Sequence, residues 1–294
     1  MTRDESLGYL LGSLGVLAFS LTLPATRIAV AVMHPAIVGL GRALIAALAA
    51  AIILAILRPP LPRGREWASL AVVSAGVVFG FPFLSAWAMQ HVPSMHGAVV
   101  LALLPLGSTL FGALRNGERP SAGFWLVSIL GSALVILFAV LAGAGGLHWA
   151  DLALVGAVLA ASLGYAEGTR VARRLGGWAV ISWALVIAVP VLAIPVALTA
   201  DQVPWQELTL EVWIAFFYVA LISQYLGFFA WYRGMTLGGV AKVGQLQLLQ
   251  IFLTLGFSWL LLGERLDLLT LVFALAVFVC VAWGRRMPVY RLSG

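Results

Sequence analysis

Long apolar runs recur along the whole chain and constrain its fold more than any other feature. Many exceed about 18 residues, the length that lets a helix cross a bilayer. The chain is 63% hydrophobic and only 10% charged, whereas soluble domains are about 45–50% apolar and about 25% charged. The runs are continuous rather than alternating, which favours helices over a β-barrel. The sequence therefore predicts an all-α, polytopic membrane protein embedded in a lipid bilayer.

Proline and glycine residues punctuate these runs and divide them into ten candidate transmembrane helices. The candidate spans cover residues 7–26, 35–57, 67–89, 94–114, 121–141, 150–170, 178–199, 210–232, 238–262 and 267–284. The connections between them are short and leave no room for a soluble domain. No small-residue cleavage site ends the first run, so we predict that it is a membrane span rather than a signal peptide.

Cations are distributed unequally between the two sets of connections. If the N-terminus is cytoplasmic, 14 of the 17 Lys and Arg residues fall in inner segments and two in outer segments. This is the positive-inside pattern, so we predict that both termini are cytoplasmic. The net charge of +6 then indicates orientation, and we expect no nucleic-acid partner.

The triplet Gly-Glu-Arg occurs twice, at residues 117–119 and 263–265, and each copy ends an apolar run. The offset of 146 residues is close to half of the 294-residue chain. A duplicated unit with an odd number of spans must be inverted in its second copy. We predict a 5+5 inverted repeat, with five-helix units at residues 7–141 and 150–284. A chance match of two triplets is the alternative.

Two segments carry a resemblance to a known family. LLPL…LRNGERP in the fourth span and LQIFLTLGFSWLLLGERL in the ninth, with the ten-span plan, resemble the EamA-type drug/metabolite transporters. The resemblance covers essentially the whole chain and implies a monomeric transporter of small molecules in the bacterial inner membrane, with no cofactor and no metal. It departs at Ile251, where the family often has the proline that Pro105 supplies in the first half. The aromatic and glutamine content is most similar to the amino-acid exporter branch, which includes the YddG-type exporters.

Two of the charged residues within the predicted spans are candidates for a functional role, because an ionised group is costly in the membrane. Arg42 stands about two turns into the second span and suits a carboxylate-binding cation. The alternative is a structural tether to helix-end carbonyls or to Glu264. Glu167 stands one helical turn before Arg170 and suits either a proton or ammonium site or a local ion pair. We expect no other carboxylate buried in the middle of a span, which favours exchange or uniport over proton antiport.

The ninth span carries three glutamines. Gln247 and Gln250 are three residues apart and share a helix face, whereas Gln245 lies off that face. An amide both donates and accepts hydrogen bonds, which suits a zwitterion or a heterocycle. Interhelical hydrogen bonding is the alternative. These three residues are candidate substrate-binding residues.

Aromatic residues are concentrated in the third and eighth spans. Phe83 and Phe229 are related by the same offset of 146 residues, and Gln224 and Tyr225 lie in the middle of the eighth span. Such side chains stack against an aromatic substrate or simply pack helices. Pro82 and Pro105 fall near the predicted midplane and are candidate hinges.

Two further expectations concern packing and hydration. Gly8, Gly12 and Gly15 lie on the first span and are predicted to permit close helix contacts. His96 lies near the start of the fourth span, and we expect it to be hydrated by the adjoining loop.

The sequence offers no pattern typical of an enzyme. The histidines are scattered at span ends without metal-ligand spacing, and no phosphate-binding loop occurs in a suitable context. We therefore predict an exporter or facilitator of small organic metabolites, foremost amino acids with hydrophobic or aromatic side chains, that works by alternating access. The alternatives are a multidrug or other-metabolite transporter of the same fold, and a non-saturable channel.

Overall fold

Helices make up nearly all of the computed structural model, which describes residues 3–142, 149–284 and 287–291. The first half of the described chain contains α1 (Arg3–Ser20), α2 (Thr22–Val30), η1 (Ile37–Gly41), α3 (Arg42–Leu57), α4 (Arg65–Val73), η2 (Ser74–Gly80), α5 (Phe81–Ala88), α6 (Ser94–Val100), η3 (Leu101–Leu103), α7 (Leu104–Asn116), β1 (Glu118–Pro120) and α8 (Ala122–Ala142). The second half contains α9 (Trp149–Leu175), α10 (Gly177–Thr199), η4 (Ala200–Gln202), η5 (Trp205–Glu207), α11 (Leu210–Phe217), η6 (Tyr218–Leu226), α12 (Gly227–Gly238), α13 (Val240–Gly244), α14 (Gln247–Leu262), α15 (Leu268–Gly284) and β2 (Val289–Arg291).

Consecutive helical elements join end to end into membrane-length stretches. Among the described residues, eight stretches are long and apolar enough to cross a bilayer: Arg3–Val30, Ile37–Leu57, Arg65–Ala88, Ser94–Asn116, Trp149–Leu175, Gly177–Gln202, Leu210–Gly238 and Val240–Leu262. The helices α8 and α15 are also strongly apolar and pack against each other. The predicted all-helical, polytopic architecture is confirmed, while the number of ten membrane spans stays a prediction.

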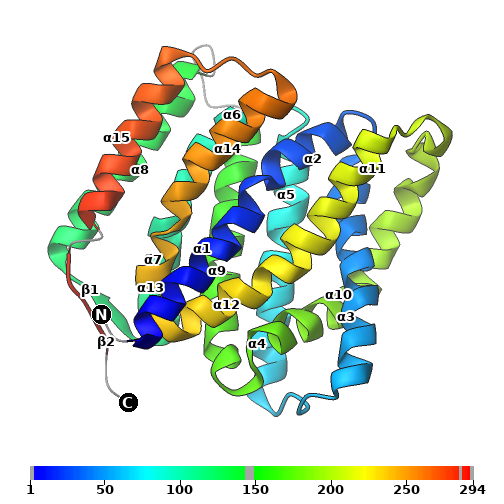
Figure 1. Cartoon of the computed structure of the whole chain (residues 1–294), viewed down its shortest axis with the longest axis horizontal. Coiled ribbons are helices and arrows are strands. Elements are labelled where there is room, and N and C mark those ends of the chain that lie inside the picture. The colour runs from blue at the N-terminus through cyan, green and yellow to red at the C-terminus, as the bar shows by residue number, and fades with distance from the viewer. Residues whose placement is uncertain (1–2, 143–148, 285–286, 292–294) are drawn as a thin grey trace.

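The bundle is arranged around α9, which packs against α4, α5, α7, α10 and α12. The paired helices α8 and α15 form one side of the molecule, and α3 and α10 form the opposite side (Figure 1). Most of the buried apolar residues form one continuous cluster through the centre. Any polar group held there is therefore shielded from water and from lipid.

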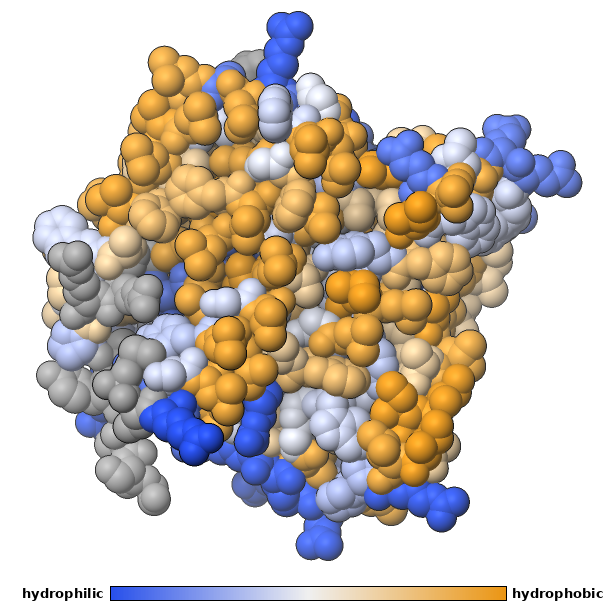
Figure 2. Space-filling view, in the orientation of Figure 1, coloured by the Kyte–Doolittle hydropathy of each residue, from blue (hydrophilic) through white to orange (hydrophobic). Residues whose placement is uncertain are grey.

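The outer surface carries an apolar belt. In the space-filling view, hydrophobic residues cover the middle of the visible face and hydrophilic residues gather toward its two ends (Figure 2). Large apolar side chains such as Ile56, Leu126 and Leu260 are more than 60% exposed. Such exposure is favourable in hydrocarbon, where the helices satisfy their backbone hydrogen bonds internally.

Several stretches change helix type within their length. The segments η1, η2 and η6 are π-helical, and η3 is a 3₁₀ turn. Pro82 and Pro105 lie in the first turns of α5 and α7, directly after η2 and η3. A proline donates no backbone hydrogen bond, which suits such a junction. The two prolines therefore mark irregular joints, and their role as hinges stays a prediction.

Glycines bring α1 and α12 into close contact, as predicted. A Cβ atom on Gly8 would lie 2.8 Å from the backbone nitrogen of Gly238, and one on Gly15 would lie 3.1 Å from the Cβ of Trp231. Small residues are how helices approach closely in lipid, where the hydrophobic effect does not drive association. This seam joins the first helix to the second half of the chain.

Two short strands close one end of the bundle, a feature that the sequence did not predict. The strand β1 pairs antiparallel with β2, with Arg119 opposite Tyr290. The backbone of the residues that follow α7 is thereby joined to the last described segment of the chain.

Candidate functional site

A small cavity lies at the centre of the bundle and is lined from seven of the eight membrane-length stretches. Its lining includes Phe19, Thr22, Arg42, Val77, Phe81, Leu104, Tyr165, Ser223, Gln224, Phe228 and Gln250. The free volume is about 20 Å³, which is close to the space of one water molecule. The structure therefore brings Arg42, Gln224 and Gln250, three of the predicted site residues, together around this small cavity.

Arg42 is the only charged residue in that lining and is 1% exposed. It begins α3, directly after the π-helical η1. Its Nε and Nη1 atoms have no hydrogen-bond partner in the structure. The alternative tether to Glu264 is not observed, because that carboxylate binds Ser94 and Met95. Burying a cation with unused donors costs free energy unless an anion or ordered water accepts hydrogen bonds from these donors.

The glutamines of α14 supply amide groups beside this cation. The Gln250 side chain donates to the Phe19 carbonyl at 3.5 Å, and its Oε1 has no partner. Neither amide atom of Gln247 makes a well-formed hydrogen bond among the described residues, and this amide lies beside the Tyr165 hydroxyl. Both residues line a second cavity of about 10 Å³, in agreement with their predicted shared helix face. Gln245 is also buried with an unpartnered Oε1, but it lies outside the lining of both cavities.

Hydroxyl groups complete the polar part of the cavity. The Thr22 and Ser223 hydroxyls share a hydrogen bond of 2.7 Å across α2 and η6. Gln224 donates to the Val77 carbonyl at 2.8 Å and so joins η6 to η2. Sequence reasoning missed Thr22, Ser223 and Tyr165, because Ser, Thr and Tyr are common in membrane helices and bond readily to their own backbone.

Aromatic rings form the apolar wall. The ring centroids of Phe19 and Phe228 are 5.1 Å apart, and those of Tyr165 and Trp231 are 5.5 Å apart. Contacts at these spacings are typical of favourable aromatic pairs. The cavity thus combines one cation, several amide and hydroxyl groups, and an aromatic wall.

Three predicted aromatic residues lie outside the lining of this cavity. Tyr225 is 1% exposed and its hydroxyl bonds to Ser182 at 2.7 Å, while its ring meets Phe229 edge-on at 4.8 Å. Phe83 pairs with Phe79 at 6.0 Å. The offset of 146 residues relates the Phe79–Phe83 pair to the Tyr225–Phe229 pair. In this conformation these rings pack helices, and a substrate contact by any of them stays a prediction.

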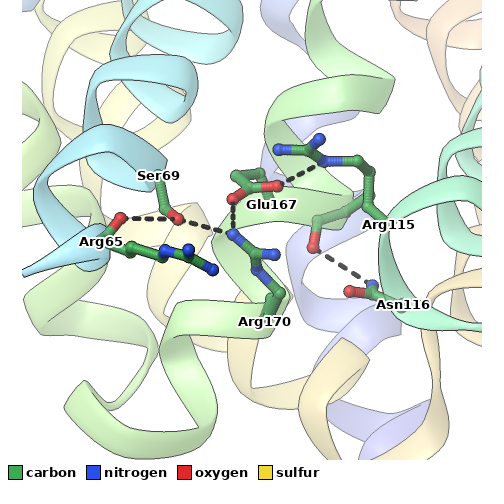
Figure 3. A network of polar contacts seen from close by, with 7 residues as sticks. Arg65, Ser69, Arg115, Asn116, Glu167 and Arg170 are labelled. Atoms are coloured by element: carbon green, nitrogen blue, oxygen red, sulfur yellow. Dashed lines mark hydrogen bonds and ion pairs between the residues drawn. The ribbon is translucent and has the colours of Figure 1, made fainter.

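Glu167 lies at the centre of an ion-pair network that joins three helical stretches (Figure 3). Its side chain is fully buried and pairs with the Arg115 Nε at 2.8 Å and with Arg170. Arg170 also donates to the Ser69 hydroxyl at 2.9 Å. The predicted local pair with Arg170 is confirmed, and the link to Arg115 adds a contact between α7 and α9. Both arginines are partly exposed, so the network lies at one end of the bundle.

The glutamates of the two Gly-Glu-Arg triplets make matching contacts. Each glutamate follows one of the stretches Ser94–Asn116 and Val240–Leu262 and binds the first backbone nitrogens of the other stretch. Glu118 accepts hydrogen bonds from the backbone nitrogens of Val240 at 3.1 Å and Ala241 at 3.0 Å, at the start of α13. Glu264 accepts from the backbone nitrogens of Ser94 and Met95, both at 2.9 Å, at the start of α6. Adding 146 to 118, 94 and 95 gives 264, 240 and 241. A carboxylate is favourable at a helix N-terminus, whose amide donors lack internal partners.

The expectation for His96 is wrong. The side chain is 9% exposed and its Nε2 lies 2.5 Å from the Asp151 Oδ1, in the first turn of α9. The loop does not hydrate it, because α6 turns this side chain toward α8 and α9. Asp151 is also buried, at 3% exposed, but it lies in the first turn of α9 and so does not contradict the expectation that no carboxylate other than Glu167 is buried in the middle of a span.

Comparisons with known proteins agree with a transport function. The model of the EamA-like transporter family matches residues 6–141 and again residues 148–283. The uncharacterized transporter YdeK of Bacillus subtilis (strain 168) is 44% identical over 279 residues, which cover 95% of this chain and 97% of that protein. A probable terminal-alkyne amino-acid exporter of Streptantibioticus cattleyicolor is 27% identical over 265 residues, covering 84% of this chain and 83% of that protein. One solved crystal structure shares the fold, with a TM-score of 0.70, 20% identity and coverage of 95% of this chain and 97% of that one.

Proposed function

Because the chain belongs to the EamA-like transporter family, we propose that it carries small organic metabolites, foremost amino acids with hydrophobic or aromatic side chains, through its central cavity. The membrane and transport parts of this statement follow from the family. The amino-acid part is supported by the distant relative named as an amino-acid exporter and by the chemistry of the cavity.

The unused donors of Arg42 are the observation that carries the proposal. A substrate carboxylate on either edge of the guanidinium group would satisfy one of these two donors, and ordered water or a further acceptor would satisfy the other. The free Oε1 of Gln250 and the Oε1 of Gln247 can accept hydrogen bonds from an ammonium group. The aromatic wall at Phe228 and Tyr165 suits an apolar or aromatic side chain.

Alternating access between two inverted five-helix units, residues 7–141 and 150–284, is the proposed mechanism. The matching contacts of Glu118 and Glu264 support this arrangement, because each carboxylate of one half holds a helix start of the other half. The unequal distribution of cations supports cytoplasmic termini and an inner-membrane location. Labelling residues 115–120 and 263–266 from each side of the membrane tests this topology, and the same sidedness for both would contradict it.

Counterflow in proteoliposomes tests the substrate assignment. Vesicles are loaded with unlabelled phenylalanine, leucine or another amino acid, and the uptake of the labelled compound is followed. Saturable counterflow supports a transporter, whereas a channel shows none. A drug panel in the same vesicles distinguishes the multidrug alternative, which predicts uptake of cationic or neutral compounds without a carboxylate.

The Arg42→Gln variant tests the role of the cation. We expect counterflow of a transported amino acid to fall about tenfold or more, which corresponds to the loss of a charge-assisted hydrogen bond. Thermal stability should hold or rise, because an unpaired buried charge is removed. Arg58→Gln is the matched control, since Arg58 is an exposed arginine that follows the same helix. Normal transport by Arg42→Gln would refute the assignment.

Alanine variants test the remaining candidates. Gln247→Ala should reduce counterflow because it removes an amide beside the cavity. Tyr225→Ala should reduce it if the ring contacts substrate during the cycle. If neither change alters the transport of any compound, these two residues do not belong to the substrate route.

A further inference from the structure

The buried pair of His96 and Asp151 is not part of the central cavity and has no role in the function proposed above. Its Nε2–Oδ1 distance is 2.5 Å, and the two residues are 9% and 3% exposed. The pair joins α6 to the first turn of α9. Histidine is the side chain that ordinarily gains or loses a proton near neutral pH, so this contact holds a titratable group in an apolar setting.

The ring of His96 packs against an aromatic side chain. The His96 ring lies 5.3 Å from the Phe138 ring of α8, which in turn lies 5.5 Å from Phe273 of α15. The helices α8 and α14 carry no ionisable side chain, and α15 carries only Cys280. A buried carboxylate in such a setting is stabilised by a cationic partner.

Two further charged groups face the same end of α6. On α2, Arg27 donates to the backbone carbonyl of Val92 at 3.0 Å and to that of Met89. After α14, Glu264 accepts from the backbone nitrogens of Ser94 and Met95. Both are engaged by backbone groups, so Asp151 is the group that meets the imidazole directly.

The short helix α6 connects this pair to the substrate route. It begins at Ser94, is followed by the 3₁₀ turn η3, and contributes Ala98 to the wall of the cavity that Gln247 and Gln250 also line. A shift of α6 would therefore break the pair and widen the cavity together. Helical joints of this kind are common places for such a movement.

We propose that His96 and Asp151 form a proton-binding site that holds α6 closed against α9. With the histidine protonated, the contact joins two opposite charges. With the histidine neutral, the carboxylate still accepts a charge-assisted hydrogen bond, but the attraction between opposite charges is lost. Opening hydrates both groups and removes that advantage. Acid therefore favours the closed arrangement of α6, and loss of the proton favours opening at this end of the bundle.

Cysteine labelling tests this site without reference to any substrate. In a Cys280→Ser background, Ala98→Cys is reacted with a membrane-impermeant maleimide in proteoliposomes at about pH 5.5 and about pH 8, on either side of the histidine range. After correction with free cysteine, we expect labelling several times faster at the higher pH, because the attraction between opposite charges is then lost.

Three variants give the test its controls. His96→Gln and Asp151→Asn should each remove the excess pH dependence while the protein remains monodisperse. His91→Gln should keep it, because His91 is an exposed histidine between α5 and α6. The proposal is overturned if the parent protein labels with the pH dependence of free cysteine, or if His96→Gln behaves as the parent does.

The labelling result is independent of the proposed substrates. Failure of every amino acid in counterflow, with the pH effect intact, removes the substrate assignment and leaves the proton site. Normal counterflow with pH-independent labelling removes the proton site alone.

Discussion

Replacing Glu118 by glutamine should destabilise the protein more than any change of an exposed carboxylate. Glu118 is 4% exposed and its two oxygens accept from the backbone nitrogens of Val240 and Ala241 at 3.1 Å and 3.0 Å. An amide has one acceptor oxygen and one NH₂ group. One of the two helix-start donors would therefore face another donor and lose its partner.

The magnitude follows from those two contacts. An unsatisfied buried donor costs about 1–3 kcal/mol, and the loss of a negative charge at a helix N-terminus costs about 0.3–2 kcal/mol. We expect a total of about 2–4 kcal/mol for Glu118→Gln. Glu264 is less buried, so water replaces part of what Glu264→Gln removes, and we expect about 1–2 kcal/mol there.

Thermal unfolding of the purified protein in detergent, followed by intrinsic tryptophan fluorescence, measures the effect. Glu118→Gln should lower the Tm by roughly 5–10 °C, and Glu264→Gln should lower it by less. Glu207→Gln is the control, because Glu207 is exposed in the connection between α10 and α11. If Glu118→Gln has the same Tm as this control, the carboxylate does not stabilise the helix start, and the reasoning for both triplets is wrong.

Three further variants have outcomes that the structure predicts. Glu167→Gln should destabilise the protein by about 1–3 kcal/mol in chemical denaturation, because its two partly exposed arginines lose a fully buried partner; equal stability would contradict this. Gly8→Ala should lower the Tm, because its Cβ would lie 2.8 Å from a backbone nitrogen of α12, whereas Gly256→Ala, with nothing within 4 Å, should melt at or above the parent Tm. Tyr225→Phe should cost about 1 kcal/mol in the same unfolding assay through loss of the bond to Ser182, and a stabilised variant would show that this bond is not needed.

The membrane class of the fold was predictable because it depends on hydrophobicity alone. Runs of apolar residues predict the helical stretches. Gly8 and Gly15 predict a close helix contact, because small residues let helix backbones approach each other in lipid. The strand pairing of β1 with β2 was not predictable, since three residues with ordinary composition carry no strand signal.

The candidate site was predictable only where a residue stands out against lipid. The polar side chains of Arg42, Gln224 and Gln250 cost free energy when they are buried in hydrocarbon. Their presence in apolar runs therefore indicated a functional site. Tyr165 and Thr22 line the same cavity, but such residues have no comparable cost and remain ambiguous in a sequence.

The contacts between distant residues needed the structure. His96 and Asp151 are 55 residues apart on different helices, and each lies near a helix end where a hydrated side chain is the usual case. No local pattern states that two such residues face each other. The sequence placed the Gly-Glu-Arg triplets at matching positions, but not the helix starts that their glutamates bind.

The reciprocal contacts of Glu118 and Glu264 also bear on how the protein is made. Glu118 is synthesised 122 residues before its partner Val240, and Ser94 is synthesised 170 residues before its partner Glu264. Until the second half is made, the Glu118 carboxylate and the backbone nitrogen of Ser94, both in the first half, lack the partners that they have in the complete protein. Arrival of the second half satisfies both at once, so a split protein made as two separate chains has a chemical reason to reassemble in the correct pairing.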